Sequence, residues 1–268
     1  MSTPLDNIDW LTRSKNRITV LDALIEESWE RSDLQELTGV SRVTSNRMLA
    51  ELEDRNWIQP DSHEYEITST GRLIIEDLNR LLDTTTTGQK LGDIQRYLPV
   101  EDIDFDLRKL RDANVHRPSK SDPNGPARRM GTLLSEAAYV RVFVPSAAPI
   151  PIRRHRDQVL ENEAHDAEAV FTAEAVESAL ADPEMAAWFQ EMIDTGRYQW
   201  YRYGGRFPYN VVMADDTVML TLFDDRSGGG WFHSMIESTD STVYSWAEQT
   251  FERYKREAEP LDASSFKP

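Results

Sequence analysis

The stretch LQELTGVSRVTSNRMLAELEDRNWIQ, residues 34–59, decides how the first part of this chain folds. Its leading apolar residues continue a helix that we expect to be capped by Ser32 and to end at Gly39, a residue suited to the left-handed conformation that terminates helices. Ser41 is then a suitable cap for a second helix, over residues 42–55. Two short helices joined by a tight turn that contains glycine form a helix-turn-helix.

The flanking sequence extends this motif into a larger domain. Residues 6–27 place apolar side chains at helical spacing. Residues 57–58 and 65–68 predict two strands joined by a turn, and another helical pattern opens at Thr70. The order helix, helix, recognition helix, hairpin, helix is that of a winged helix-turn-helix.

Helical periodicity divides the recognition helix into two faces. Met48, Leu49 and Leu52 should pack inward, with the small Ser45 near them. The outward face and its margin then carry Arg42, Val43, Thr44, Asn46 and Arg47.

These outward side chains are the types that read base edges. Arginine pairs with guanine, asparagine with adenine, and a valine or threonine methyl group contacts thymine. Ser41 and the helix N-terminus would hold a backbone phosphate. Ser62 and His63, at the tip of the wing, are either minor-groove or phosphate contacts or solvated turn residues. The expected partner is double-stranded DNA.

The charge distribution supports this prediction only in part. The whole chain has 30 basic and 47 acidic residues, a net charge of −17, and residues 1–82 contribute 9 − 16 = −7. Such a balance repels DNA and leaves open a winged helix that acts through protein contacts. However, residues 37–50 contain no acid, and this gap covers the turn and the half of the recognition helix that must approach phosphate.

Composition excludes several other classes of protein. The chain has no cysteine, so disulfides and thiolate chemistry are excluded, and its five histidines are not at metal-ligand spacing. We therefore expect no metal and no cofactor. No apolar stretch approaches the roughly 18 residues of a membrane span, and the first residues lack a signal pattern, so we expect no membrane contact and a cytoplasmic protein.

The basic residues are 24 arginines and six lysines. Abundant acid with scarce lysine resembles the composition of proteins from halophilic archaea, because a large net charge keeps a protein soluble where salt screens repulsion. An acidic protein from a low-salt organism is the alternative.

The middle of the chain suggests three segments: a winged helix over 1–82, a helical linker or dimerisation segment over 83–120, and an α/β domain over 121–268. The threonine run 84–87 and Gly88 should interrupt the helix, because they are poor helix formers. Apolar residues on both sides of that run, between Leu73 and Leu98, form a stripe. The stripe would make either a homodimer contact or a contact with the chain's own second domain.

The last segment alternates predicted strands and helices, which indicates an α/β or α+β fold with a mixed sheet. Strands are expected at 139–144, 167–171, 198–203, 209–214, 218–223 and 231–236. Asp182 should cap a helix with Pro183 at its first position, and residues 214–217 should join two strands as a hairpin. An amphipathic helix should close the domain near 241–258.

The order of these elements resembles a known family. The stretches VRVFVPS, AEAVFT, YQWYRYGGRFPYNVVMADDTVMLTLFD, WFHSMIES and YSWAEQTFERYKREAEPL are similar to the sensor domains of haloarchaeal helix-turn-helix regulators. These domains are related to the middle domain of the methanogenesis regulator FilR and, more distantly, to the phospholipase-D-like sensor of TrmB sugar regulators. The resemblance implies a DNA-binding transcriptional regulator with a C-terminal effector-sensing domain. Asn56 stands where winged helices of this kind usually carry glycine, and asparagine tolerates the same backbone conformation.

A phospholipase-D-like sheet raises the possibility of an enzyme. That chemistry needs a histidine with a lysine two residues later, and none of the five histidines has one. Nucleophile-elbow, P-loop and dinucleotide-binding motifs are also absent from the sequence. We therefore expect a protein that is not an enzyme.

Two further acid-free stretches, 137–156 and 195–214, suggest where an effector binds. An unopposed basic cluster after a sheet strand favours a small anion such as a sugar phosphate or a carboxylate. The alternative is that these arginines pair with surface carboxylates, which the chain has in surplus. The expected effector-site residues are Ser146, Arg153, Arg154, Arg156, Tyr201, Arg202, Tyr203 and Arg206.

Overall fold

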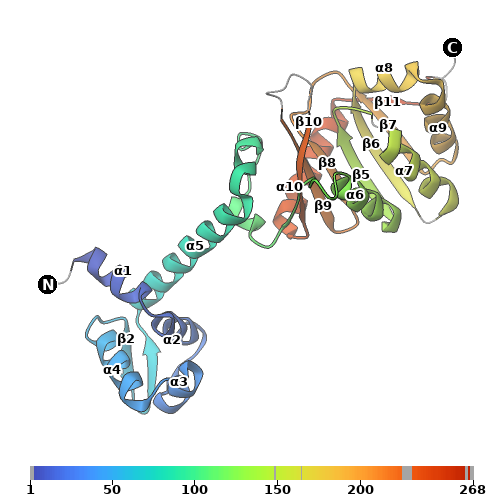
Figure 1. The fold of residues 1–268 in the computed structure, drawn as a ribbon. Coiled ribbons are helices and arrows are strands. Elements are labelled where there is room, and N and C mark those ends of the chain that lie inside the picture. The colour runs from blue at the N-terminus through green and yellow to red at the C-terminus, as the bar shows by residue number, and fades with distance from the viewer. Residues whose placement is uncertain (1–2, 148, 164, 225–230, 263–264, 266–268) are drawn as a thin grey trace. The chain divides into compact units, whose positions relative to one another are not determined.

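The computed structural model describes residues 3–147, 149–163, 165–224, 231–262 and 265. The chain divides into two compact units, Met1–Thr85 and Thr86–Pro268 (Figure 1). The long helix α5 (Ser69–Leu91) begins in the first unit and ends in the second. Among the described helices, none is long and apolar enough to cross a membrane.

The first unit has the element order of a winged helix. The sequence pattern predicted its helix-turn-helix, hairpin and following helix, and Trp29 adds a short strand that pairs with the hairpin in the sheet order β1-β3-β2. The elements before α5 are α1 (Pro4–Thr12), α2 (Lys15–Glu26), β1 (Trp29–Glu30), α3 (Arg31–Thr38), α4 (Arg42–Glu53), β2 (Ile58–Asp61) and β3 (Glu64–Ile67).

Two helix starts in this unit differ from expectation. The single helical pattern over 6–27 is two helices, because the chain leaves helical geometry at Ser14, which is extended. Helix α3 begins at Arg31 with Glu30 in the cap position, so Ser32 lies inside the first turn rather than at the cap. Its hydroxyl contacts the carboxylates of Glu30 and Asp33 at 3.4 Å and receives no backbone N–H of the helix.

The threonine run does not interrupt α5, contrary to expectation. The hydroxyl of Thr84 donates to the carbonyl of Arg80 at 2.8 Å, and that of Thr85 donates to the carbonyl of Leu82 at 2.8 Å. Threonine side chains satisfied in this way by the preceding turn remain compatible with a helix. Thr87 is buried, so packing also holds this part of the helix.

The second unit is an α/β domain with an eight-stranded mixed sheet (Figure 1). The sheet order is β11-β7-β6-β5-β8-β9-β10-β4, in which β5, β6 and β7 are parallel and the other pairings are antiparallel. Its strands are β4 (Asn114–His116), β5 (Tyr139–Val144), β6 (Asp166–Thr172), β7 (Tyr198–Tyr203), β8 (Asn210–Ala214), β9 (Thr217–Asp224), β10 (Trp231–Ser238) and β11 (Glu259–Leu261).

Helices cover both faces of this sheet and give it two cores. One face packs against α6 (Gly125–Glu136), α7 (Pro149–Glu161), α8 (Ala173–Ala181) and α9 (Pro183–Asp194). The other packs against α10 (Ser241–Arg256), the 3-10 helices η1 (Gly92–Tyr97) and η2 (Leu107–Leu110), and the end of α5. Along β5 to β9 the side chains alternate between these two cores, as the pleat requires, whereas β10 is interrupted by an irregularity between Phe232 and Ser234.

The segment expected as a linker is built into the second unit. Leu91, Ile94 and Leu98 are buried in the core under the sheet, and Asn114–His116 pairs with β10. The apolar stripe between residues 73 and 98 is therefore divided between two cores. Only Leu73, Leu81 and Leu82 of the large apolar residues in that range are exposed on the described chain.

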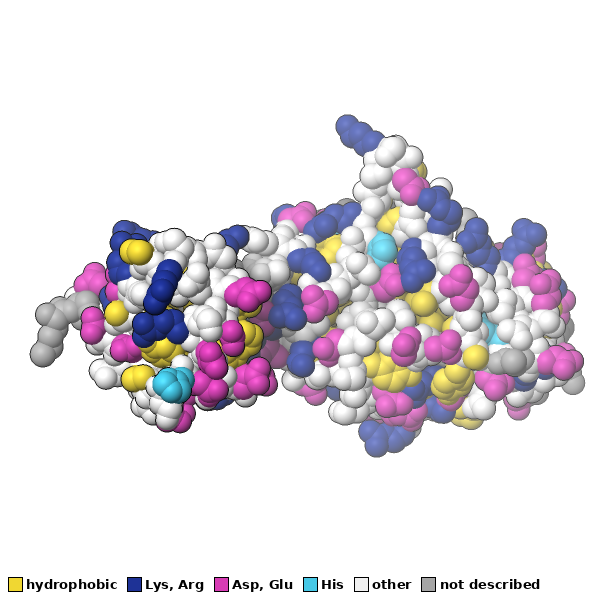
Figure 2. All heavy atoms as spheres, turned by 90° about the horizontal axis from the view of Figure 1, so that it is seen from below, with side chains coloured by type: hydrophobic (Ala, Val, Ile, Leu, Met, Phe, Trp, Pro, Cys, Tyr) yellow, Lys and Arg dark blue, Asp and Glu magenta, His cyan; other side chains and the backbone are white. Residues whose placement is uncertain are grey.

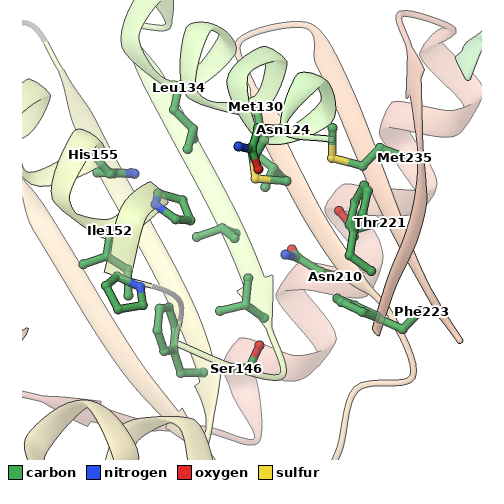
Figure 3. Close-up of a pocket in the computed structure, with 18 of the residues that line it drawn as sticks. Asn124, Met130, Leu134, Ser146, Ile152, His155, Asn210, Thr221, Phe223 and Met235 are labelled. Atoms are coloured by element: carbon green, nitrogen blue, oxygen red, sulfur yellow. The ribbon is translucent and has the colours of Figure 1, made fainter. Parts of the chain in front are cut away.

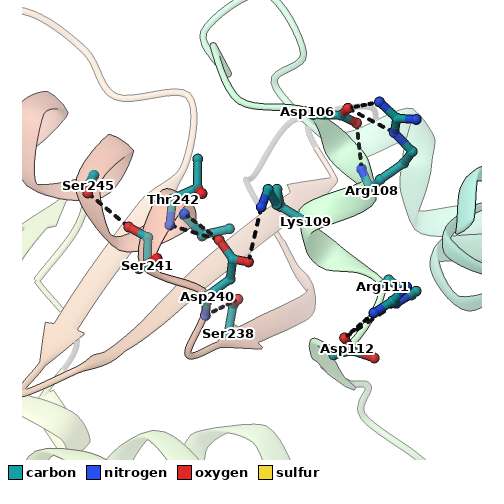
Figure 4. Close-up of polar contacts among 11 residues, drawn as sticks. Asp106, Arg108, Lys109, Arg111, Asp112, Ser238, Asp240, Ser241, Thr242 and Ser245 are labelled. Carbon is teal, nitrogen blue, oxygen red and sulfur yellow. Dashed lines mark hydrogen bonds and ion pairs between the residues drawn. The ribbon is translucent and has the colours of Figure 1, made fainter. Parts of the chain in front are cut away.

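Polar contacts tie η2 to the start of α10 (Figure 4). Asp240 caps α10 by accepting from the backbone N–H of Thr242 at 2.8 Å, and its carboxylate lies 3.9 Å from Lys109 Nζ of η2. At the start of η2, a hydrogen bond from the Arg108 side chain lowers the pKa of Asp106 to about 2. The contact between Lys109 and Asp240 thus joins η2 to α10, two helices that cover the same core.

Candidate functional site

Helix α4 has the cap and the buried face that the sequence predicts. Ser41 Oγ accepts a hydrogen bond from the backbone N–H of Thr44 at 3.3 Å, so the cap supplies a partner for an N–H that the helix itself leaves unpaired. Met48, Leu49 and Leu52 are buried, and Ser45 beside them is fully buried. This packing fixes which side of α4 faces outward.

The outward side of α4 carries the predicted contact residues. Arg42, Val43, Thr44 and Arg47 are exposed, with Val43 at 79% of its full accessibility. Arg47 makes only a loose ion pair with Glu51, at 3.9 Å. Figure 2 shows Lys and Arg side chains grouped on one face of this unit, with Asp and Glu along its border.

Asn46 is half-buried and differs from its neighbours. Its Oδ1 lies 3.5 Å from an Arg31 nitrogen, at the limit of a hydrogen bond. Arg31 also donates to the hydroxyl of Tyr65 in β3 and lies over its ring, with Cζ 5.5 Å from the ring centroid. Arg31 thus places a further positive charge beside the recognition helix. Nothing in the spacing of the sequence indicated this residue, because the contact depends on three separate elements.

The wing is a tight hairpin with its tip in solvent. Strands β2 and β3 pair antiparallel from Ile58 and Ile67 to Asp61 and Glu64. Ser62 turns the chain with a φ of 56°, and His63 beside it is exposed. Both predicted wing residues are therefore accessible to a ligand.

The eight predicted effector residues do not form one site. Ser146 lines a cavity on the face of the sheet covered by α6 and α7. Tyr201 and Tyr203 lie on the opposite face, because alternation along β7 turns them toward the core under α10. A common site would have to pass through the sheet.

Two of the predicted arginines are neutralised by carboxylates. Arg156 pairs with Glu191 at 2.5 Å and with Asp157 at 2.8 Å, and the hydrogen bond to Glu191 raises the pKa of Arg156. Arg202 pairs with Glu177 at 3.0 Å. The sequence left open the alternative that these arginines pair with surface carboxylates. For Arg156 and Arg202 the contacts support that alternative.

The remaining three predicted arginines, Arg153, Arg154 and Arg206, are exposed. Arg153 and Arg154 are on α7, and Arg206 follows β7. Arg154 packs over Gly131 of α6 so closely that a Cβ at that glycine would lie 2.5 Å from the guanidinium. Its position is therefore explained by packing between two helices.

A cavity beside Ser146 is a concave feature of the described second unit that sequence reasoning missed (Figure 3). It has a volume of about 470 Å³ and lies between the sheet and helices α6, α7 and α9. The alternation of side chains along a strand could have predicted which strand residues face this side of the sheet. It could not have predicted that the covering helices leave a space above them. The lining residues are Pro123, Asn124, Ala127, Met130, Leu134, Val142, Val144, Ser146, Pro149, Pro151, Ile152, His155, Phe171, Phe189, Met192, Tyr198, Asn210, Val212, Thr221, Phe223, Phe232 and Met235.

His155 lines one side of this cavity and contacts a second buried histidine, His165. His165 Nδ1 is 2.8 Å from the carbonyl of Ala137, and its Nε2 is 3.4 Å from Nε2 of His155. Because a carbonyl only accepts, His165 Nδ1 is the donor of the bond to Ala137. Burial and the neighbouring His165 lower the pKa of His155 to about 3, so this side chain is neutral near pH 7.

Family models match both units of the chain. Residues 5–90 match the HVO_A0261 N-terminal domain, and residues 123–257 match the middle domain of the methanogenesis regulatory protein FilR1. The chain belongs to the FilR1 middle-domain family. It is a regulatory protein in which this domain follows a winged helix-turn-helix, and the two matches together support a DNA-binding transcriptional regulator.

A search of curated proteins found no match to this regulator. Solved structures with a similar arrangement include TrmBL2, an archaeal chromatin protein with a novel mode of DNA binding (14% identity, 96% of this chain, 99% of that chain, TM-score 0.45). Nuc from Salmonella typhimurium, a phospholipase D family member, is 11% identical over 56% of this chain and 98% of its own, with a TM-score of 0.42. Phosphatidylserine synthase of Haemophilus influenzae is 11% identical over 58% of this chain and 41% of its own, with a TM-score of 0.43. At these levels the similarities carry no argument about activity.

Proposed function

We propose that this regulator binds double-stranded DNA by inserting α4 into the major groove and laying the β2–β3 wing beside it. The observation that carries the proposal is the exposed outward face of α4, which is acid-free over residues 42–50 and begins at a capped N-terminus. Arg42 and Arg47 would read guanine, Val43 and Thr44 would contact thymine methyl groups, and Asn46 would read adenine after leaving Arg31.

Phosphate contacts would position this helix. Ser41 and the N-terminus of α4 offer backbone N–H groups to one phosphate, and Arg31 supplies a charge close by. Ser62 and His63 would contact the backbone or the minor groove from the wing tip. We also propose that the protein acts in the cytoplasm, in contact with DNA and not with a membrane.

A second candidate function is a winged helix that binds another protein. The exposed Leu37 and Val43 favour it, because they add apolar area to the same surface. The net charge of −7 over residues 1–82 favours it as well. The deciding experiment is fluorescence anisotropy with labelled DNA from upstream of the regulator's own gene. Saturable binding that unlabelled random DNA does not displace supports the first candidate, whereas no binding at any salt concentration supports the second.

The salt dependence of that binding should be shallow or reversed. An ordinary basic domain with 6–10 phosphate contacts loses about 10³–10⁵ in affinity between 50 and 200 mM salt. The winged helix repels DNA at low salt, and screening relieves that repulsion. We expect the Kd to change by less than about tenfold between 0.1 and 2 M potassium chloride. A thousandfold loss over this range would contradict the prediction and, with it, adaptation to high salt.

We propose that the regulator is a homodimer, since paired helix-turn-helix domains fit half-sites about one helical turn apart. The exposed Leu81 and Leu82 of α5 would contribute to the contact. Full burial of a leucine side chain contributes about 1.5–3 kcal/mol to the free energy of association. In a twofold dimer each leucine is buried once in each protomer, so its contribution is made twice.

The double substitution Leu81→Lys and Leu82→Lys should therefore raise the dimer dissociation constant at least a hundredfold in sedimentation experiments. Leu160→Lys, on α7, is the matched control because this leucine is also partly exposed. An unchanged dimer in the double variant, or a monomeric parent chain, would rule out this interface.

We further propose that the second unit senses an effector and is not a catalyst. Its membership of a regulatory family and the absence of a histidine–lysine pair at phospholipase spacing support this role. An effector changes DNA affinity only if it binds one arrangement of the protein better than another. The residues expected at its site are divided between the two faces of the sheet, with Tyr201 and Tyr203 on the α10 side, so we expect a different part of the unit to bind it.

A further inference from the structure

The cavity on the α6 and α7 side of the sheet has the size and lining of a small-molecule site. Its volume of about 470 Å³ lies within the roughly 300–1,000 Å³ of ligand pockets. The walls combine aromatic and aliphatic side chains from six strands and three helices. All of these residues belong to the second unit, so the cavity does not depend on where the first unit lies.

The cavity provides no charge to a ligand. Among the described residues that line it, none is a lysine, an arginine, an aspartate or a glutamate. The one titratable base, His155, is neutral near pH 7 because burial holds its pKa at about 3. An anion entering this cavity would lose its hydration without gaining a counter-charge, and such a transfer is strongly unfavourable.

Two polar atoms in the cavity have no hydrogen-bond partner. Asn210 of β8 and Thr221 of β9 are directly opposite each other in the antiparallel register. Within the part of the chain that the structure describes, neither Asn210 Oδ1 nor Thr221 Oγ1 has a hydrogen-bond partner, although Thr221 is only 2% exposed. Figure 3 shows both side chains on the sheet side of the cavity, with Met130 and Asn124 across from them.

Unsatisfied buried polar atoms are rare in proteins, because each one loses its hydrogen bonds to water. Two of them on neighbouring strands, facing the same cavity, indicate a group that both can bond. An amide oxygen only accepts, so that group must donate a hydrogen. The threonine hydroxyl can then donate to the same group or accept from it.

We propose that this cavity binds an uncharged, largely apolar molecule whose hydroxyl or amide N–H donates to Asn210 Oδ1 and bonds Thr221 Oγ1. The role of this molecule as an effector rests on the proposed function, but its binding does not. The chemistry is opposite to the anion that the arginine distribution predicted, because those arginines are outside the cavity.

Three naphthalene probes test the proposal in calorimetry or fluorescence titrations with the full chain. 1-Naphthol carries a donor, 1-methoxynaphthalene has the donor blocked, and 1-naphthoate is an anion with the same rings. We expect 1-naphthol to bind at least tenfold more tightly than either of the others. Naphthoate binding as tightly as naphthol, or no binding by either neutral probe, would overturn the proposal.

Variants connect the binding to the two polar atoms. Thr221→Val keeps the shape of the side chain and removes the hydroxyl, and Asn210→Leu removes the amide. Each should weaken 1-naphthol at least tenfold and reduce its advantage over the methoxy compound. Thr250→Val is the matched control, because Thr250 is equally buried on the other face, in α10. Unchanged naphthol binding in both cavity variants would contradict the proposal.

A stability measurement separates a ligand site from a water-filled one. Without ligand, Thr221→Val should unfold at the same or a higher temperature than the parent, because an unsatisfied buried hydroxyl is removed. If an ordered water satisfies that hydroxyl as part of the fold, the variant should unfold at a lower temperature, which would contradict the proposal. Neither assay contains DNA, so a failure of DNA binding would contradict the proposed function alone.

Discussion

Replacing Arg42 and Arg47 with alanine should abolish specific DNA binding and leave the fold intact. Both side chains are exposed on α4 and take no part in its core. Each bidentate base contact contributes about 1–3 kcal/mol of discrimination, so the double variant should lose roughly 30-fold to 10⁴-fold in affinity for its operator. Anisotropy titrations with operator and random DNA measure this loss directly.

Arg80→Ala is the matched control for that experiment. Arg80 is exposed on α5 and pairs with Asp77, at 3.0 Å within the same helix, so its removal takes one positive charge from the first unit without changing α4. We expect it to change the Kd by less than about threefold, consistent with the small contribution of exposed ion pairs. If the double variant binds operator DNA as the parent does, α4 is not the recognition helix and the protein-binding alternative gains support.

Gly71→Ala should destabilise the winged helix more than any other single methyl group added to α5. A Cβ at this position would lie 2.0 Å from the backbone oxygen of Trp57 and 3.0 Å from Cγ1 of Ile67. The oxygen is held in place, since it accepts from the backbone N–H of Thr68 at 3.0 Å. Relief of the clash must separate α5 from the wing. We expect a loss of about 3 kcal/mol or more, at the upper end of overpacking effects.

Gly88→Ala makes the same chemical change in the same helix with the opposite expectation. No atom of the described residues lies within 4 Å of the Cβ that it would add, and its backbone is helical. Alanine is favoured over glycine in a helix by about 1 kcal/mol, so this variant should be slightly stabilised. Denaturant unfolding followed by circular dichroism compares the two. Equal midpoints for Gly71→Ala and the parent would show that the close approach of α5 to Trp57 is not rigid.

The sequence was sufficient where a local backbone conformation requires a particular residue. Gly39 ends α3 with a φ of 64°, and Asn56 takes a φ of 57° in the place where related domains carry glycine. Asp182 caps α9 ahead of Pro183, and Asp215 turns the hairpin between β8 and β9 with a φ of 50°. These signals act over three or four residues, so they are readable without knowledge of the fold.

Local signals were insufficient where neighbouring residues compete or where packing compensates for low propensity. Ser32 resembles a cap, but the chain already enters the helix one residue earlier, at Arg31. The threonine run resembles a break, but the hydroxyls of Thr84 and Thr85 bond the preceding turn and Thr87 is buried. In both places the sequence offered a plausible local structure, and the surrounding contacts selected another.

The sequence by itself determined the winged helix, the outward face of its recognition helix and the mixed sheet, because periodicity and caps record them locally. The candidate ligand site was decided only by the tertiary structure. Charge along the chain pointed to arginines, but Arg156 and Arg202 meet carboxylates from other elements, and the pleat of β7 turns Tyr201 away from the cavity. Asn210 and Thr221 carry no signal in the sequence. They form a candidate site because β8 and β9 place them opposite each other, and because the helices that cover this face leave a cavity between themselves and the sheet.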